Sequence, residues 1–525
     1  MSKDKSFVGL EEILKELGPF GKYNLINYAL LLFPCFLAGM FGSVFVFEAA
    51  AIDYRCKIPE CEVLNQSLWL DSAIPKEQNK DSLHNYVINF QPKTGRNKEF
   101  YTEKRSLFQF NLGCQEWKRT LIGTIHNSGL FISLPLTGVI SDKFGRKKAL
   151  AIASLMNCIF GFSRSFAPNY YVMVLLEFCE AAMGAGAYTT AFVLAMELVG
   201  PRGRVLGNTL INIVFVFGLM TLSGLSWILQ SWRTLLRVIY APACLVFSYL
   251  WILNESVRWL LSKGRHDEAV AILQKAAKMN KVQLTDQILW PLQEMEKIKP
   301  VSEKREMDEP VVNTTPIYIQ VLRSNIIRRR VVTCSYLWIT CTFVYYGLSI
   351  NSVSLAGNKY INFMLVAFVE IPANLCCLYV LDRFGRKRVM IIMYIVSATV
   401  FCFNNILFFS STGWISLIVY LSGKFSITVA YSSVYIYVSE VFPTNVRQSL
   451  LAVCSATGRI GSTLAPLTPV LAQYYTNLPS IFFGTLAVIA GLLVFTLPET
   501  INVPLPDSIE EAERLSREKQ QNHNA

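Results

Sequence analysis

Apolar runs of about 20 residues recur along the whole chain and constrain its fold more than any other feature, since a helix of this length crosses the roughly 30 Å hydrocarbon core of a bilayer. Only 16% of the residues are charged, whereas a soluble domain carries about 25%. The sequence therefore predicts an all-α integral membrane protein with twelve transmembrane helices. The predicted spans are 24–47, 120–140, 149–166, 170–195, 205–228, 234–253, 331–350, 360–381, 389–410, 414–438, 448–472 and 479–498.

The second part of the chain repeats features of the first part. The loop DKFGRK at 142–147 recurs as DRFGRK at 382–387. Two more motifs recur in the same order and at nearly the same offset, MELVGPRGR as SEVFPTNVR and NESVRWL as LPETINV. Three pairs in one order at one spacing indicate an internal duplication. We therefore expect two six-helix halves, 24–253 and 331–498.

The distribution of positive charge predicts the orientation. Much of the net charge of +12 sits in short connections such as the two DxFGRK loops and the arginines at 328–330, so it does not indicate nucleic acid. Short loops rich in Lys and Arg stay in the cytoplasm. An even number of spans then places both termini, 1–23 and 499–525, in the cytosol. The segment 254–330 becomes a cytosolic linker with short helices, one of them at 265–280.

The segment 51–117 is predicted to be an external loop. It holds Cys56, Cys61 and Cys114, in a compartment that permits disulfides. Three cysteines allow one bridge, and the sequence leaves the pairing open. Asn65 begins an Asn-Gln-Ser glycosylation sequon in the same loop, so we expect it to carry a glycan.

Two six-helix halves with these motifs resemble the major facilitator superfamily, whose halves move about a site near the membrane midplane. ESVRWLLSKGR at 255–265 and LPET at 497–500 are shared with sugar porters. FNLGCQEWKR at 110–119, VEIPA at 369–373 and EVFPTNVR at 440–447, with the long external loop, are similar to the organic ion transporter family. The chain is identified as a member of that family. The resemblance implies a carrier of small organic cations, anions or zwitterions such as carnitine, and not an enzyme.

The resemblance also assigns the basic loops to gating. In the family such loops form salt bridges between helices that latch the outward-facing state. Positive-inside signalling would explain the Lys and Arg residues but not an Asp and a Gly at matching positions in both halves, so we favour a latch. The candidate gating residues are Asp142, Gly145, Arg146, Glu197 and Arg204 in the first half and Asp382, Gly385, Arg386, Glu440 and Arg447 in the second.

Two carboxylates in the fourth span are candidates for coupling or substrate binding. An ionised residue at a helix centre costs about 3 kcal/mol on insertion scales, so Glu177 and Glu180 should face a partner or a route for substrate. They lie three residues apart on one helix face, which also carries Tyr188, and such a pair suits a proton or a cation. The superfamily resemblance places an Arg at the position of Glu177. The alternative role is a buried pair bonded to neighbouring helices.

Two charges in the second half bear on substrate class. Anion and carnitine carriers of the family place an Arg at the position of Arg459, where cation carriers place an Asp, and a guanidinium suits bidentate binding of a carboxylate. The alternative is a salt bridge from Arg459 to another helix. Glu370 is usual across the family and selects no charge. Anion carriers often have a Lys where this chain has Asn374, which weakens the anion hypothesis.

Aromatic and polar side chains complete the predicted substrate site. Aromatic faces attract ammonium groups through cation–π interactions worth about 2 kcal/mol when desolvated. Tyrosines also pack ordinary helix interfaces, so each one alone is ambiguous. Lys424 is expected to belong to the bundle structure. The remaining candidates for substrate contact are Tyr188, Asn212, Tyr345, Tyr346, Tyr431 and Tyr435.

These observations predict a plasma-membrane carrier that works by alternating access on organic cations or zwitterions, either carnitine-like or imidazole-amine conjugates. An organic anion carrier that uses Arg459 is the alternative, and a sugar porter or a non-transporting receptor is remote. We expect a monomer in the lipid bilayer with no cofactor, metal, catalytic residue or nucleic-acid partner. The substrate itself, and coupling to a proton or sodium ion, are left open.

Overall fold

The computed structural model describes most of the predicted spans and their short connections. Isolated positions near the N-terminus and in the predicted external loop are described as well. There, two short strands, β1 (Arg55–Lys57) and β2 (Asn89–Gln91), pair antiparallel. The continuously described residues are 21–48, 115–199, 204–282, 323–355, 357–407, 413–443, 446–475 and 477–501.

The first six predicted spans are all helical, and several consist of two or three consecutive helices. The bend between the first two helices falls at Gly42. In chain order the helices are α2 (Lys22–Phe41), α3 (Val44–Glu48), α6 (Glu116–Phe144), α7 (Arg146–Arg164), α8 (Tyr170–Gly184), α9 (Gly186–Leu198), α10 (Arg204–Leu229), α11 (Trp232–Tyr240), α12 (Ala243–Phe247) and α13 (Tyr249–Ile252).

The last six predicted spans are helical too, which confirms the predicted class of fold. Nine helical segments of the described chain are long and apolar enough to cross a membrane by length and composition. The second-half elements are α18 (Asn325–Asn351), η4 (Ser352–Ser354), α19 (Lys359–Phe368), α20 (Glu370–Phe384), α21 (Arg386–Leu407), α22 (Gly413–Val441), α23 (Arg447–Leu464), η5 (Ala465–Leu467), α24 (Thr468–Tyr474) and α25 (Leu478–Phe495).

Two short helices follow the first half, α14 (Val257–Ser262) and α15 (His266–Asn280). The second matches the helix predicted at 265–280. It packs against the start of α2, where the backbone N–H of Tyr23 donates to Asn280 Oδ1 at 2.8 Å. The start of the linker is therefore attached to the first transmembrane helix.

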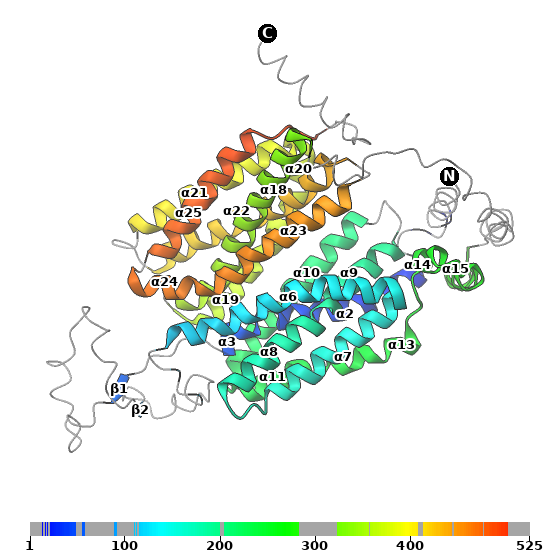
Figure 1. Ribbon diagram of the computed structural model, residues 1–525, viewed down its shortest axis with the longest axis horizontal. Helices are drawn as coiled ribbons and strands as arrows, with labels where there is room; N and C mark the ends of the chain where they lie inside the picture. The colour runs from blue at the N-terminus through cyan, green and yellow to red at the C-terminus, as the bar shows by residue number, and fades with distance from the viewer. Residues whose placement is uncertain are drawn as a thin grey trace, which may run out of the picture.

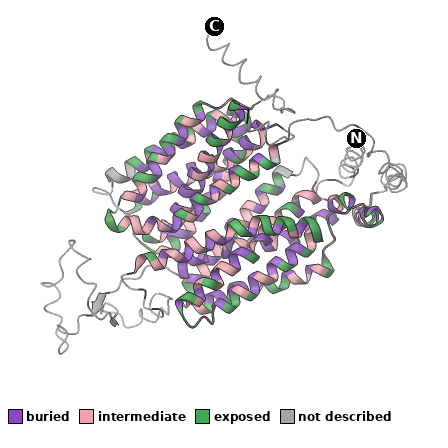
Figure 2. Cartoon of the chain, in the orientation of Figure 1, coloured by how far each residue is buried: buried purple, intermediate pink, exposed green. Residues whose placement is uncertain are grey.

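The helices form two groups that correspond to the two halves of the sequence (Figure 1). Buried residues concentrate inside each group, and many exposed residues lie on the outer faces of the helices (Figure 2). Many of these exposed residues are large and apolar, among them Ile228, Trp251 and Leu492. An apolar exterior around a packed interior is what a bilayer requires of a helical bundle.

Small residues let helices approach closely inside the first half. A Cβ added at Gly39 of α2 would lie 2.2 Å from the carbonyl oxygen of Phe215, and one at Gly218 of α10 would lie 2.2 Å from that of Phe36. Contacts of this kind hold membrane helices together where burial from water contributes little. Helices α2 and α10 therefore pack in direct backbone contact.

The two halves meet at the end of the bundle opposite the DxFGRK loops. There Ser223 Oγ of α10 donates to the carbonyl oxygen of Tyr360 of α19 at 2.7 Å. The Tyr360 ring stacks on Trp227, with centroids 6.1 Å apart, and on Phe47, with centroids 5.8 Å apart. We call the end with Gly145 and Gly385 the basic end, and the end with Tyr360 the joined end.

Some predictions fall outside the described residues. They concern the side chains of Cys56, Cys61, Cys114 and the glycan site Asn65, and also most of the predicted linker and both termini. The backbone of Arg204 is described but its side chain is not. The domain boundaries given above stay predictions.

Candidate functional site

The candidate residues fall into three groups within the membrane-spanning part and a fourth group at the basic end. The first is a charged cluster inside the first half, and the second is an ion pair inside the second half. The third consists of Arg459 and tyrosines from both halves. The charged side chains of these groups differ in whether a partner in the described chain holds them.

The charged cluster of the first half joins three helices. His126 of α6 places its Nδ1 atom 2.8 Å from Glu177 Oε1 and 3.5 Å from Glu180 Oε2, both on α8. Arg164, the last residue of α7, forms an ion pair with Glu177. All four side chains are almost completely buried. The predicted alternative for the two carboxylates, bonding to neighbouring helices, describes the contacts that they make.

Two more buried groups surround Arg164. Its Nη2 atom lies 3.5 Å from Glu48 Oε2 of α3 and 3.4 Å from the hydroxyl of Tyr240 of α11. The guanidinium also stacks over the Tyr240 ring at 5.4 Å. Because burying a charge costs several kcal/mol unless a partner compensates it, Arg164 is the fixed cation that makes this acidic cluster possible.

The same cluster has the composition of a metal site. Ligand atoms of His126, Glu177 and Glu180 lie within 4.8 Å of one another, and imidazole with carboxylates is a common donor set for divalent metals. Arg164, however, already occupies one carboxylate of this set. A guanidinium in contact with Glu177 repels a divalent cation, so the cluster suits a single positive charge better.

The ion pair of the second half fixes Glu370 of α20. Lys424 Nζ of α22 lies 2.9 Å from Glu370 Oε1, and the hydroxyl of Tyr345 of α18 donates to Glu370 Oε2 at 2.6 Å. The ammonium also donates to Ser349 Oγ at 2.8 Å and sits 3.3 Å from the centroid of the Tyr345 ring. The carboxylate of Glu370 is thus neutralised inside the half that carries it.

Arg459 of α23 is in a different situation. It is partly buried, and no hydrogen bond or ion pair to the described chain holds its guanidinium, while its backbone oxygen accepts from Ser462 and Thr463. The predicted alternative, a salt bridge to another helix, is therefore absent among the described residues. The side chain lies close enough to His126 and to Tyr431 to act on both electrostatically.

Aromatic rings gather next to Arg459. Tyr431 of α22 packs against Trp338 and Tyr345 of α18, with centroids 5.5 and 5.7 Å apart. Tyr435, one turn further along α22, lies 5.6 Å from Trp338 and is 47% exposed. Tyr346 packs edge-on against Tyr345 at 5.2 Å. The predicted second-half tyrosines are thus one connected group.

Tyr188 joins this group from the first half. It lies near Tyr346, Tyr431 and Tyr435, and its ring meets Phe215 of α10 edge-on at 5.6 Å. Ala185, the residue between α8 and α9, keeps helical backbone angles, so the two helices form one span, Tyr170–Leu198. Tyr188 lies eight residues, about 12 Å, beyond Glu180 along this span, and its role next to the carboxylates stays a prediction.

Asn212 stays near this region but is bonded within its own helix. It lies on α10, is partly buried, and its Nδ2 donates to Asn208 Oδ1 at 3.4 Å. Asn374 is similarly engaged, donating to the Glu370 carbonyl and accepting from Ser432. Both amides are therefore satisfied by protein groups.

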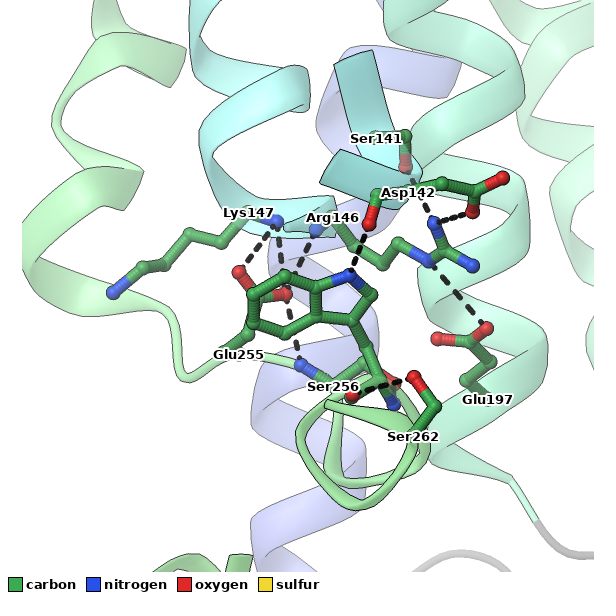
Figure 3. Close-up of polar contacts among 9 residues, drawn as sticks. Ser141, Asp142, Arg146, Lys147, Glu197, Glu255, Ser256 and Ser262 are labelled. Atoms are coloured by element: carbon green, nitrogen blue, oxygen red, sulfur yellow. Dashed lines mark hydrogen bonds and ion pairs between the residues drawn. The ribbon is translucent and has the colours of Figure 1, made fainter. Parts of the chain in front are cut away.

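At the basic end, Glu255 closes the turn between α6 and α7 (Figure 3). Its carboxylate accepts from the backbone N–H groups of Arg146 at 2.9 Å and Lys147 at 3.1 Å. These are unpaired donors at a helix N-terminus, where an anion is favoured. The Arg146 side chain pairs with Asp142 and lies 3.7 Å from Glu197 of α9.

The second half repeats this arrangement. Glu499 accepts from the backbone N–H groups of Arg386 at 3.0 Å and Lys387 at 3.2 Å. The Arg386 side chain lies 3.1 Å from Glu440 of α22 and 3.4 Å from Asp382. The duplication seen in the sequence is therefore a duplication of contacts.

Two predicted gating residues differ from this pattern. Arg447 donates from Nε to the carbonyl oxygen of Phe442 at 3.1 Å, and the side chain of Arg204 is outside the described residues. The described bonds of Arg146 and Arg386 stay within one half each, and the side chains of Asp142 and Asp382 are 73% and 78% exposed. Their role in gating stays a prediction.

The turn glycines give a direct test of this arrangement. Gly145 has φ +106°, and an added Cβ would lie 2.3 Å from Glu255 Oε2. We expect Gly145→Ala to cost about 2–3 kcal/mol, the sum of a left-handed backbone and a displaced helix cap. The measurement is the thermal midpoint of the purified protein in detergent. Gly138→Ala is the control, because nothing lies within 4 Å of its added Cβ, and equal midpoints for the two variants would contradict the prediction.

Sequence reasoning missed His126 and Arg164. His126 lies in an apolar run, and Arg164 lies two residues before the end of its predicted span, where a charge usually marks the membrane surface. A signal was present, because a buried carboxylate such as Glu177 needs a cation. Within the first six predicted spans the basic side chains are Arg164, Arg237 and His126.

Comparison with known proteins gives consistent matches over most of the chain. A family model described as "Sugar (and other) transporter" matches residues 82–512. The chain is 32% identical to an organic cation transporter protein of Drosophila melanogaster, covering 97% of this chain and 95% of the relative. It is 31% identical to organic cation/carnitine transporter 2 of Rattus norvegicus, with coverage of 97% and 95%.

Solved structures match in fold. A partially occluded inward open conformation of the xylose transporter XylE from E. coli superposes with a TM-score of 0.63 at 16% identity, covering 91% of this chain and 98% of that one. At this identity the match speaks for the arrangement of helices and not for substrate.

Proposed function

From the premise that this chain belongs to the organic ion transporter family of the major facilitator superfamily, we propose that its substrates are small organic zwitterions or cations with a polar tail. As a member it is a membrane transporter of organic ions and not an enzyme. The choice of substrate rests on which membrane-embedded charges have an oppositely charged partner in the protein. Glu177 and Glu370 each have a cationic partner in their own half, whereas Arg459 has none among the described residues.

A zwitterion uses both features next to Arg459. Its carboxylate would receive a charge-assisted, bidentate pair of hydrogen bonds from the guanidinium. Its ammonium end would lie against the rings of Tyr431, Tyr435 and Tyr188, where cation–π attraction is available. A carnitine-like molecule or an amine conjugate with a carboxylate carries both groups.

A carrier of organic anions is the second candidate. It is favoured by the same unpaired Arg459, because an anion needs only the guanidinium and an apolar surround. The acidic cluster of the first half weighs against it, since Glu177 and Glu180 lie around His126, which itself interacts with Arg459. Carboxylates close to the site repel a substrate whose charge is purely negative.

We further place the protein in the plasma membrane with both termini and the basic end in the cytosol. The positive charge of the DxFGRK loops supports this orientation. The halves are joined at Ser223 and Tyr360, at the opposite end. The described conformation then corresponds to an inward-facing state of an alternating-access cycle, and the basic loops act when the halves close on the cytosolic side.

Uptake by reconstituted vesicles tests the proposal. We expect saturable uptake of labelled L-carnitine that exceeds uptake of tetraethylammonium, a pure cation, and of p-aminohippurate, an organic anion. Protein-free vesicles give the background. Uptake of p-aminohippurate alone would support the anion carrier instead. Uptake of tetraethylammonium alone would exclude a role for Arg459 in binding a carboxylate.

A further inference from the structure

We propose that His126, together with Glu177 and Glu180, binds a proton that travels with the substrate, and that the carboxylate held by Arg459 controls its occupancy. This inference rests on the proposed function, because it concerns the same substrate carboxylate. It adds a second, ionic cargo and a site for it in the first half.

The charge balance of the cluster calls for more positive charge than Arg164 supplies. Glu48, Glu177 and Glu180 are three carboxylates, and Arg164 is the permanent positive charge that contacts Glu177 and lies 3.5 Å from Glu48. All four side chains are buried, where an uncompensated charge is costly. His126, equally buried, faces Glu177 and Glu180, so a proton on its ring adds positive charge beside both carboxylates.

The geometry shows where the proton binds. Nδ1 of His126 faces both Glu177, at 2.8 Å, and Glu180, at 3.5 Å. With Glu177 and Glu180 ionised, both can only accept hydrogen bonds, so Nδ1 then carries a hydrogen and the lone pair of the neutral ring is on Nε2. The transported proton adds to Nε2 as the substrate is bound and leaves from it on the other side of the membrane. No other bond forms or breaks.

Arg459 connects this site to the substrate. It belongs to α23 of the second half, which packs across the interface against α6, the helix of His126. The guanidinium acts electrostatically on His126 and opposes a second positive charge there. A substrate carboxylate that pairs with Arg459 cancels this field, so binding of substrate and proton are favourable together. Movement of the halves changes the separation of α6 and α23 and hence the coupling.

Other charged or titratable groups near His126 are Glu48, Arg164 and Tyr240. The Glu48 carboxylate of α3 lies on the side of Arg164 and attracts a positive charge on the imidazole, whereas the Arg164 guanidinium repels it. Tyr240 of α11 bonds to Arg164. The Phe45 ring lies 5.6 Å from the imidazole and limits its contact with water. All of these groups belong to the first half, whereas Arg459 acts on His126 from α23 of the second half.

The first experiment measures uptake of L-carnitine into proteoliposomes under an imposed pH gradient, with the membrane potential clamped. One pH unit is a factor of ten in proton activity, so one-to-one symport allows up to about tenfold accumulation. We expect wild type to accumulate L-carnitine when the outside is acidic. His126→Gln should transport without accumulation. His266→Gln, a buried histidine of α15, is the control and should behave as wild type.

The second experiment counts protons directly. L-carnitine is added to weakly buffered, detergent-solubilised protein, and an indicator dye reports the change in free protons. Wild-type protein should take up one proton per bound molecule of L-carnitine, and His126→Gln should take up none. Transport of L-carnitine that depends on Arg459 but not on the pH gradient would overturn the inference and leave the proposed function standing. If L-carnitine is not transported at all, the proposed function fails. In that case an acid titration without substrate tests the proton site by itself. Identical proton binding by wild type and His126→Gln would refute a proton site at His126.

Discussion

Replacing Arg459 by alanine is expected to reduce uptake of L-carnitine about 10- to 100-fold at low substrate concentration. The estimate follows from the loss of charged hydrogen bonds worth about 1.5–3 kcal/mol. Arg459 is free to provide them because no described residue occupies its guanidinium. The measurement is initial uptake into proteoliposomes with a fixed amount of folded protein.

Two further variants sharpen this result. Arg459→Lys keeps the charge but loses the bidentate geometry, so we expect an intermediate loss. Arg265→Ala removes an arginine at the start of α15 that pairs with Glu268 and lies over the Trp259 ring, far along the chain from Arg459, and it should leave uptake unchanged. Full activity of Arg459→Ala would contradict both the proposed binding mode and the choice of a carboxylate-bearing substrate.

Replacing Lys424 by methionine is expected to give the largest loss of stability. The ammonium is fully buried and pairs with Glu370 at 2.9 Å, and removing one partner of a buried ion pair costs about 3–5 kcal/mol. Among the described residues, the remaining carboxylate keeps the hydroxyl of Tyr345 as its side-chain partner. The measurement is the thermal midpoint and the yield of monodisperse protein in detergent.

The double variant separates charge from packing. Lys424→Met combined with Glu370→Leu removes both charges, and apolar replacement of a buried pair is often neutral, so stability should recover. Lys143→Met, at an exposed position, is the matched control for loss of a lysine. A single variant as stable as wild type would show that Glu370 does not depend on Lys424 for its charge.

Most of the fold could be predicted because the signals are local and repeated. Each apolar run had the length of a membrane helix, and the DxFGRK loops gave the duplication that reappears in the caps at Glu255 and Glu499. Breaks within spans were not predictable in the same way. The turn at Gly42 divides the first predicted span into α2 and α3, although the apolar run continues through it.

The site was only partly predictable, because charge pairing is a property of neighbouring helices. Glu177 was recognised as costly and Glu370 as a candidate, but the sequence could not identify Arg164 and Lys424 as their partners. The sequence likewise could not show that Arg459 has no oppositely charged partner among the described residues, which is what makes it available to a substrate. Which charges are satisfied inside a half, and which remain for a ligand, depends on packing and not on residue type.

The closure at the joined end has a kinetic consequence for a carrier that alternates between two states. One neutral hydrogen bond from Ser223 and ring contacts of Tyr360 with Phe47 and Trp227 hold it. Such contacts contribute about 0.5–1.5 kcal/mol each. A carrier must break and remake such contacts on every turnover, and neutral contacts cost less to separate than buried ion pairs, whose loss leaves a charge without a partner.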